Sequence, residues 1–108
     1  MNPRRPLLDH ETLDIYRVAL DFLALALRLL ESVPRQRREL RSQLERAAMS
    51  VTLNIAGARF YAIARGSALE CGALLDVAGL MHHAAPELQD EGKRLLGRVV
   101  AMLTRMCR

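Results

Sequence analysis

Residues 15–30 (IYRVALDFLALALRLL) constrain the fold most, because only Arg17, Asp21 and Arg28 are charged among them. These three residues lie at positions i, i+4 and i+11, which places them on one narrow stripe of an α-helix. A helix that is apolar around the rest of its circumference must be covered on more than one side. In a chain of 108 residues we expect the second cover to be another copy of the chain. The interface would then contain Ile15, Leu20, Leu23, Leu27 and Leu30.

Proline and glycine positions divide the chain into four expected helices, over residues 9–32, 36–56, 60–83 and 86–107. Pro34 follows the first helix, and Pro86 suits the first turn of the fourth. Gly57 should end the second helix in the left-handed region, which a residue without Cβ enters at low cost. The expected fold class is all-α, an antiparallel up-down-up-down four-helix bundle. Residues 9–108 form its single domain, and residues 1–8 form a mobile amino-terminal arm.

Apolar residues at alternating steps of three and four predict the buried side of each later helix. Three glycines weaken the third helix by about 1 kcal/mol each relative to alanine, which is expected where another backbone approaches closely. These are Gly66, Gly72 and Gly79. The predicted stripe of the third helix contains Ile63, Ser67, Glu70, Leu74, Val77 and Met81. The second helix should bury Leu40, Leu44, Ala47, Val51 and Asn54 or Ile55, and the fourth Leu88, Leu95 or Leu96, Val99, Met102 or Leu103 and Met106.

Four polar side chains fall where helical spacing predicts burial, namely Ser50, Asn54, Ser67 and Glu70. Buried polar groups destabilise a fold unless each finds a partner. If the second and third helices are neighbours, Glu70 could accept a hydrogen bond from Ser50, Asn54 or Arg46. Such a polar core network would fix the register of an otherwise interchangeable aliphatic core. The alternative is that Glu70 faces solvent.

No pattern in the sequence indicates catalysis, a metal site or a cofactor. A di-iron bundle needs Glu-x-x-His on two helices, and no glutamate here has a histidine three residues later. The glycines are too scattered for a phosphate-binding loop. Residues 18–30 are too short and too charged to cross a bilayer. Cys71 and Cys107 are far apart, so we expect free thiols, no enzymatic activity and a cytoplasmic protein.

Arginine dominates the positive charge: the net charge is +4, and Lys93 is the only basic residue that is not arginine. Arginines that cluster on one helix can contact successive phosphates of RNA or DNA. Glu39 and Glu45 lie among them, and the alternative is a solvated helix face. The candidate nucleic-acid-binding residues are Arg35, Arg37, Arg38, Arg41 and Arg46.

The segments LRSQLERAAMSVTLNIAG and ARGSALE resemble the four-helix-bundle family of proteins encoded in 23S ribosomal RNA intervening sequences. That family also includes the accessory protein of diversity-generating retroelements. The resemblance extends over nearly the whole chain, including the Pro34 turn. It implies a bundle that assembles as a ring-like homopentamer, with no settled activity. Together with the absence of catalytic patterns, this favours a scaffold or interaction protein without enzymatic activity. The retroelement branch further implies nucleic-acid binding, and another protein is a further possible partner.

The connection between the second and third helices departs from the family pattern. The family continues Asn-Ile-Ala with Glu-Gly and a loop rich in glycine and arginine, whereas here Ala56 is followed by Gly57-Ala58-Arg59-Phe60. The connection is either a shortened variant of that loop or the remainder of a longer flexible segment. Because the loop would add basic surface, its loss weakens the implication of nucleic-acid binding.

Overall fold

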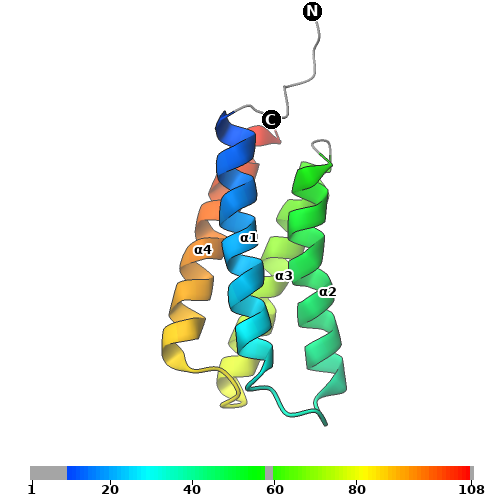
Figure 1. The fold of residues 1–108 in the computed structure, drawn as a ribbon, viewed down its shortest axis with the longest axis vertical. Helices are drawn as coiled ribbons and strands as arrows, with labels where there is room; N and C mark the ends of the chain where they lie inside the picture. The colour runs from blue at the N-terminus through cyan, green and yellow to red at the C-terminus, as the bar shows by residue number, and fades with distance from the viewer. Residues whose placement is uncertain (1–9, 58–59, 108) are drawn as a thin grey trace, which may run out of the picture.

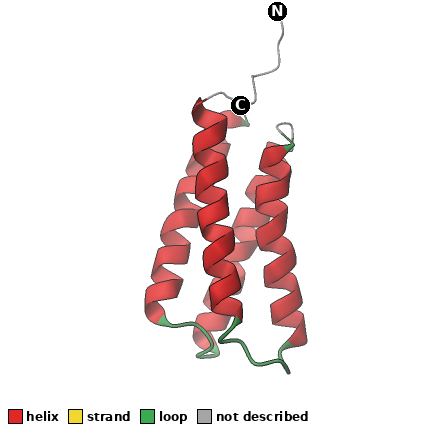
Figure 2. Ribbon diagram, in the orientation of Figure 1, coloured by secondary structure: helices red, strands yellow, loops and turns green. Residues whose placement is uncertain are grey.

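The computed structural model describes residues 10–57 and 60–107. These residues form four helices: α1 (His10–Leu30), α2 (Arg38–Ala56), α3 (Tyr61–Leu80) and α4 (Pro86–Met106). No strand occurs in the described ranges (Figure 2). The prediction of an all-α fold with four helices is therefore confirmed. The arm predicted for residues 1–8 lies outside the described residues.

Among residues 10–57 and 60–107, the left-handed residue is His82 and not Gly57. Gly57 follows the last residue of α2, Ala56, as predicted, but it has φ −69° and remains in the right-handed helical region, so the prediction of a left-handed conformation is wrong. His82 has φ 60°, and its N–H donates to the carbonyl of Gly79 at 3.0 Å. The next N–H, of His83, donates to the carbonyl of Ala78 at 2.9 Å. This reversal ends α3 at Leu80, three residues before the predicted end, because it uses the carbonyls that a further turn would need.

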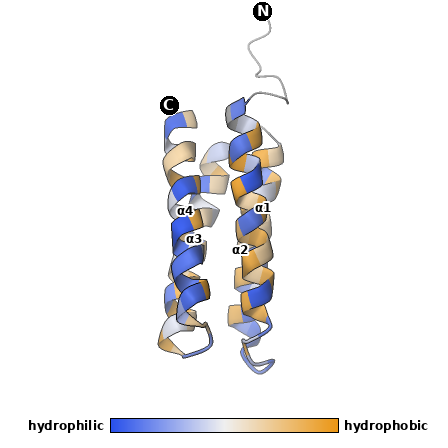
Figure 3. Cartoon of the chain, turned by 60° about the vertical axis from the view of Figure 1, so that its left-hand side comes forward, coloured by the Kyte–Doolittle hydropathy of each residue, from blue (hydrophilic) through white to orange (hydrophobic). Residues whose placement is uncertain are grey.

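The four helices are arranged around a square. Each helix packs against two neighbours in the order α1, α2, α3, α4 and back to α1. After each turn the chain runs back along the preceding helix (Figure 1). The surface formed by α1 and α2 therefore lies opposite the surface formed by α3 and α4. Figure 3 shows hydrophobic residues along much of α1 and α2, whereas α4 is mainly hydrophilic on the side facing the viewer.

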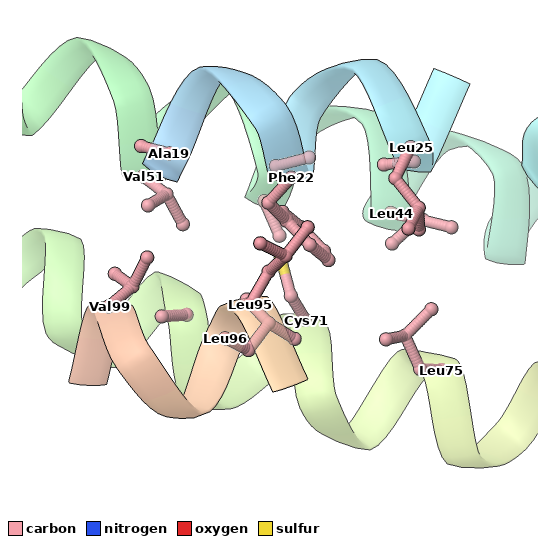
Figure 4. Packing of buried hydrophobic residues seen from close by; sticks show 14 of the residues in the cluster. Ala19, Phe22, Leu25, Leu44, Val51, Cys71, Leu75, Leu95, Leu96 and Val99 are labelled. Carbon is pink, nitrogen blue, oxygen red and sulfur yellow. The ribbon is translucent and has the colours of Figure 1, made fainter. Parts of the chain in front are cut away.

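The core consists mostly of aliphatic side chains and lies along the axis of the bundle (Figure 4). Phe22 of α1 is fully buried and contacts the region where Gly92 of α4 lies. A Cβ built on Gly92 would lie 2.9 Å from a methyl group of Leu75 and 3.2 Å from one of Leu25. Gly92 therefore lets α4 approach the large side chains of α1 and α3.

Small residues form most of the inward side of α3. Its buried positions are Ala64, Ser67, Ala68, Cys71, Leu75 and Ala78. Ile63, Val77 and Met81 were predicted on the buried stripe but are exposed, with 54%, 38% and 37% of their surface accessible. The predicted stripe is thus rotated around the helix from the observed one. The buried sides of α2 and α4 agree better with prediction, since Leu40, Leu44, Ala47, Val51, Ile55, Leu95, Leu96, Val99 and Leu103 are all buried.

Two side chains fix the turns at one end of the bundle. Nη1 of Arg41 lies 2.7 Å from the carbonyls of both Leu30 and Val33, and it donates to these groups at the end of α1. Oγ of Ser32 lies 2.7 Å from the carbonyl of Leu29 and 2.6 Å from that of His83. Ser32 thereby connects the α1–α2 turn with the α3–α4 turn. The Arg41 contacts matter for function as well, because they occupy one of the arginines predicted to bind nucleic acid.

Candidate interaction surfaces

Three of the four predicted polar residues meet between α2 and α3. Oγ of Ser50 lies 2.7 Å from Oγ of Ser67, and either hydroxyl can donate. Nδ2 of Asn54 lies 2.8 Å from the carbonyl of Ser50 and 3.0 Å from its Oγ. Only Ser67 is buried, while Ser50 and Asn54 are half-buried. The cluster therefore lies at the edge of the α2–α3 contact and not at the centre of the core.

Glu70 bonds with an arginine and not with the hydroxyl groups. Nη2 of Arg46 donates to Oε2 of Glu70 at 2.8 Å, one turn further along the two helices. The Glu70 side chain is 36% exposed and that of Arg46 is 61% exposed. Water screens such a pair, so it contributes at most about 1 kcal/mol to stability. Both expectations for Glu70 thus hold in part, since it binds Arg46 and also reaches solvent.

The five candidate arginines divide into two groups. Arg41 and Arg46 hold parts of the fold together through the contacts given above. Arg35, Arg37 and Arg38 are exposed around the α1–α2 turn and the start of α2, and no side-chain hydrogen bond or ion pair joins their guanidinium groups to the described residues. The basic surface is therefore smaller than the sequence predicts. Glu31 and Glu45 reduce it further, because they line the same surface hollow as Arg35 and Arg38.

The residues predicted for the interface between copies also divide. Ile15 is 0% exposed and Leu30 is 7% exposed, so both belong to the core of the single chain. This part of the prediction needs correction, because neither side chain has surface to offer a second copy. Leu20 and Leu27 are 39% and 46% exposed, and Leu23 is half-buried against the core. Exposed charged residues, namely Asp14, Arg17, Asp21 and Arg28, occupy much of the remaining outer side of α1.

The most apolar outer surface belongs to α3, a feature that the sequence reasoning missed. Only one of the eight exposed positions on this helix, Asp76, is charged. The other seven form what we call the α3 apolar face: Ala62, Ile63, Gly66, Leu69, Ala73, Val77 and Leu80. A surface helix normally exposes polar residues, and contiguous apolar patches mark interaction sites. The many alanines and glycines of α3 were a signal for this surface in the sequence. If the small residues had been assigned to the inner side of the helix, the larger apolar residues would have been predicted on its outer side.

The described residues show little that could support chemistry. They contain no group of three or more His, Cys, Asp or Glu side chains that could hold a metal ion. Cys71 and Cys107 are free thiols, and burial raises the pKa of the Cys71 thiol to about 12. A thiol of this kind is a poor nucleophile near neutral pH, because the thiolate is the reactive form. Within the same part of the chain, no helix has the length and apolar character needed to cross a membrane.

Comparison with known protein families identifies the family of this chain. The model of the family described as 23S rRNA-intervening sequence protein matches residues 11–105. No curated protein matches the chain. The matched range begins in the first turn of α1 and ends in the last turn of α4, so it includes all the surfaces described above.

Proposed function

The chain belongs to the family of 23S rRNA-intervening sequence proteins, and on this basis we propose that it is a self-assembling scaffold without enzymatic activity. Copies of the bundle bind one another through exposed apolar helix surfaces, and the assembly presents its polar surfaces to another macromolecule. The resemblance described above favours a ring of five copies. Two free cysteines favour a reducing compartment, the cytoplasm.

The α3 apolar face is the observation that carries this proposal. Leu69 is 51% exposed and Leu80 is 82% exposed, and no charged residue separates them except Asp76. Burial of apolar surface contributes roughly 25 cal/mol per Å². Several large side chains on one helix can therefore supply much of an association energy. Leu20 and Leu27 of α1 and Met49 and Leu53 of α2 add a second exposed apolar surface, discussed below.

The mass of the protein in solution tests self-assembly directly. Light scattering and sedimentation equilibrium at micromolar concentration should give a multiple of the 12.1 kDa chain mass, and five copies correspond to about 60 kDa. Leu69→Lys should lower the mass, because a charge on the α3 apolar face would be desolvated by association. Arg98→Glu, a charge change on the exposed side of α4, is the matched control and should leave the mass unchanged. A wild-type protein that stays at 12.1 kDa would refute the proposal.

Nucleic-acid binding is a second candidate function, favoured by the exposed arginines of the α1–α2 turn. Arg35, Arg37 and Arg38 lie within four residues of one another at one end of the bundle. In a ring with one axis, this end would be repeated in every copy on the same side. Multiple weak phosphate contacts would then act together.

Fluorescence anisotropy with labelled RNA and duplex DNA across a salt series tests the second candidate. Replacing Arg35, Arg37 and Arg38 with glutamine should weaken binding and reduce the slope of log affinity against log salt. Arg98→Gln is the control, because Arg98 is exposed on α4, away from this turn. Absence of binding at low salt, or a slope unchanged by the triple substitution, would exclude these arginines as a phosphate-binding surface.

A further inference from the structure

A shallow apolar hollow runs between α3 and α4 on the outside of the bundle. At one end Nζ of Lys93 bonds to Oδ1 of Asp76 at 2.6 Å, and at the other Nε of Arg65 bonds to Oγ1 of Thr104 at 2.8 Å. The residues between these links are small or aliphatic, and we call them the glycine notch: Leu69, Gly72, Ala73, Gly97, Val100 and Ala101.

Gly72 and Gly97 give the notch its depth. Each lies four residues from the Asp76–Lys93 link, so the two glycines are level with each other on neighbouring helices. A Cβ added to either residue would meet no atom within 4 Å. The sequence predicts close approach of another backbone at glycines of α3, and within the chain no group approaches Gly72. Gly79 differs, because the side chain of Gln89 occupies the space above it.

A ridge of larger apolar side chains lies on the opposite surface of the bundle. We call it the apolar ridge, and it consists of Leu20, Leu27, Met49 and Leu53 on α1 and α2, all between 39% and 62% exposed. Thr52 Oγ1 lies 3.5 Å from the carbonyl of Ala19, which brings the Leu20 region of α1 level with Met49 and Leu53. The same chain thus carries two exposed apolar surfaces on opposite sides of the bundle, one formed by larger side chains and the other hollowed at its glycines.

The ridge and the notch lie at similar heights along the bundle. Gly92 of α4 is adjacent to Phe22 and Leu25 of α1. Leu20 precedes Phe22 by two residues and Gly97 follows Gly92 by five, in helices that run in opposite directions in Figure 1. At 1.5 Å per residue, Leu20 and Gly97 therefore differ in height by no more than about 5 Å. Two copies with parallel axes could bring these surfaces together without sliding.

We propose that the apolar ridge of one copy packs into the glycine notch of the next copy. This inference rests on the self-assembly proposed above and names the surfaces that it uses. The contact joins two different surfaces, so it is head-to-tail, and such contacts close into a ring or continue as a filament. It also supplies the approaching group that Gly72 and Gly97 lack within the chain.

Charges beside the two surfaces favour the same arrangement. Arg35 and Arg38 are exposed beside the ridge at the end of the bundle that carries the α1–α2 turn. Asp90 is exposed beside the notch toward the same end, which also carries the α3–α4 turn (Figure 1). Asp76 lies there too, but its carboxylate already bonds to Lys93. Copies with parallel axes would bring Arg35 and Arg38 of one copy toward Asp90 of the next. Inverted copies would separate these opposite charges, so the charges favour a ring over a two-fold contact.

Disulfide cross-linking tests this contact. In a Cys107→Ser background, Leu20→Cys is combined in turn with Gly97→Cys and with Ala101→Cys, two notch positions one helical turn apart. On mild oxidation, at least one double variant should form a ladder of linked chains that ends at the number of copies in the assembly. Each variant with only one of these cysteines should remain unlinked, because in this contact a ridge does not meet another ridge and a notch does not meet another notch. Leu20→Cys with Arg98→Cys is the matched control and should give no ladder, because Arg98 lies outside the notch.

Filling the notch gives an independent readout. Gly97→Leu should strengthen the helix itself, because the added side chain meets no atom within the chain and leucine has the higher helix propensity. It should nevertheless weaken association by roughly tenfold or more, because it occupies the space of the incoming ridge. Gly97→Ala is the control and should change association much less.

The outcomes separate the two proposals. A monomeric wild-type protein would refute self-assembly and this contact together. An oligomer that gives no ladder with either notch position, that cross-links through single Leu20→Cys variants, or that tolerates Gly97→Leu would leave self-assembly intact. Any of these three results would refute packing of the ridge into the notch.

Discussion

Replacing Arg41 with methionine should lower the free energy of unfolding by about 2 kcal/mol. The guanidinium donates from Nη1 to two carbonyls, those of Leu30 and Val33, each at 2.7 Å. A hydrogen bond from a charged donor contributes about 1.5–3 kcal/mol net. The carbonyl of Leu30 also accepts from the N–H of Val33 at 3.2 Å, so it keeps one partner when the guanidinium is removed. Methionine preserves much of the apolar stem, so the loss is mainly electrostatic. We place the effect near the lower part of that range because water can reach a half-buried site.

Arg38→Met is the matched control, because Arg38 lies three residues earlier on the same helix and is exposed without a partner among the described residues. It should change stability by less than about 0.5 kcal/mol. Urea unfolding followed by far-UV circular dichroism, at one protein concentration for all variants, measures the difference. The corresponding fall in melting temperature for Arg41→Met is roughly 10 °C. If Arg41→Met and Arg38→Met had equal stability, Arg41 would not support the end of α1, and it would return to the set of arginines available for nucleic acid.

Three further predictions follow from the packing. Gly92→Ala should lower the free energy of unfolding by about 1–2 kcal/mol, although alanine has the better helix propensity, because the new methyl group would lie 2.9 Å from Leu75. A stability equal to or above that of the wild type in the same urea assay would show that the core can adjust. At pH 8 an alkylating reagent should label Cys107 and leave Cys71 unmodified. Burial raises the pKa of Cys71 to about 12, and the reactive thiolate forms only as the pH approaches that value. Equal labelling of the two cysteines in mass spectrometry would contradict the position of Cys71 in the core. Glu70→Gln should lower the free energy of unfolding, measured in thermal melts, by less than about 1 kcal/mol, because the carboxylate is partly exposed and the amide oxygen can still accept from Arg46. A larger decrease would mean that Glu70 supports more than one surface ion pair.

The sequence predicts the helices well because proline, glycine and helical periodicity act locally. It predicts the orientation of α3 poorly. Nearly every position of that helix is apolar, so hydropathy does not distinguish its inner side from its outer side. Ala64, Ala68 and Ala78 face inward because close packing against neighbouring helices favours small side chains, and the larger Ile63 and Val77 are left outside.

The roles of the arginines could not be read from the sequence for a different reason. Arg38 and Arg41 lie three positions apart in the same arginine-rich segment, yet Arg38 is exposed and Arg41 bonds to the carbonyl of Leu30 at the end of α1. This difference depends on where the α1–α2 turn places its carbonyls. The polar residues were easier to predict in part. Helical spacing places Ser50, Asn54 and Ser67 near the α2–α3 contact, but the bond of Ser50 to Ser67 and not to Glu70 required the structure. The surface of α3, by contrast, needed the fold before it could be recognised.

Ser32 constrains how the molecule can open. The helices form two hairpins, α1 with α2 and α3 with α4, which the chain joins only through the α2–α3 connection. At the opposite end, the hydroxyl of Ser32 reaches the carbonyls of Leu29 and His83, and its single hydrogen can donate to only one of them at a time. Exchange of that proton between two acceptors lets the turns shift slightly without releasing each other. Separation of the hairpins at this end requires the loss of the bond to His83, so we expect amide exchange near both turns to rise together in Ser32→Ala.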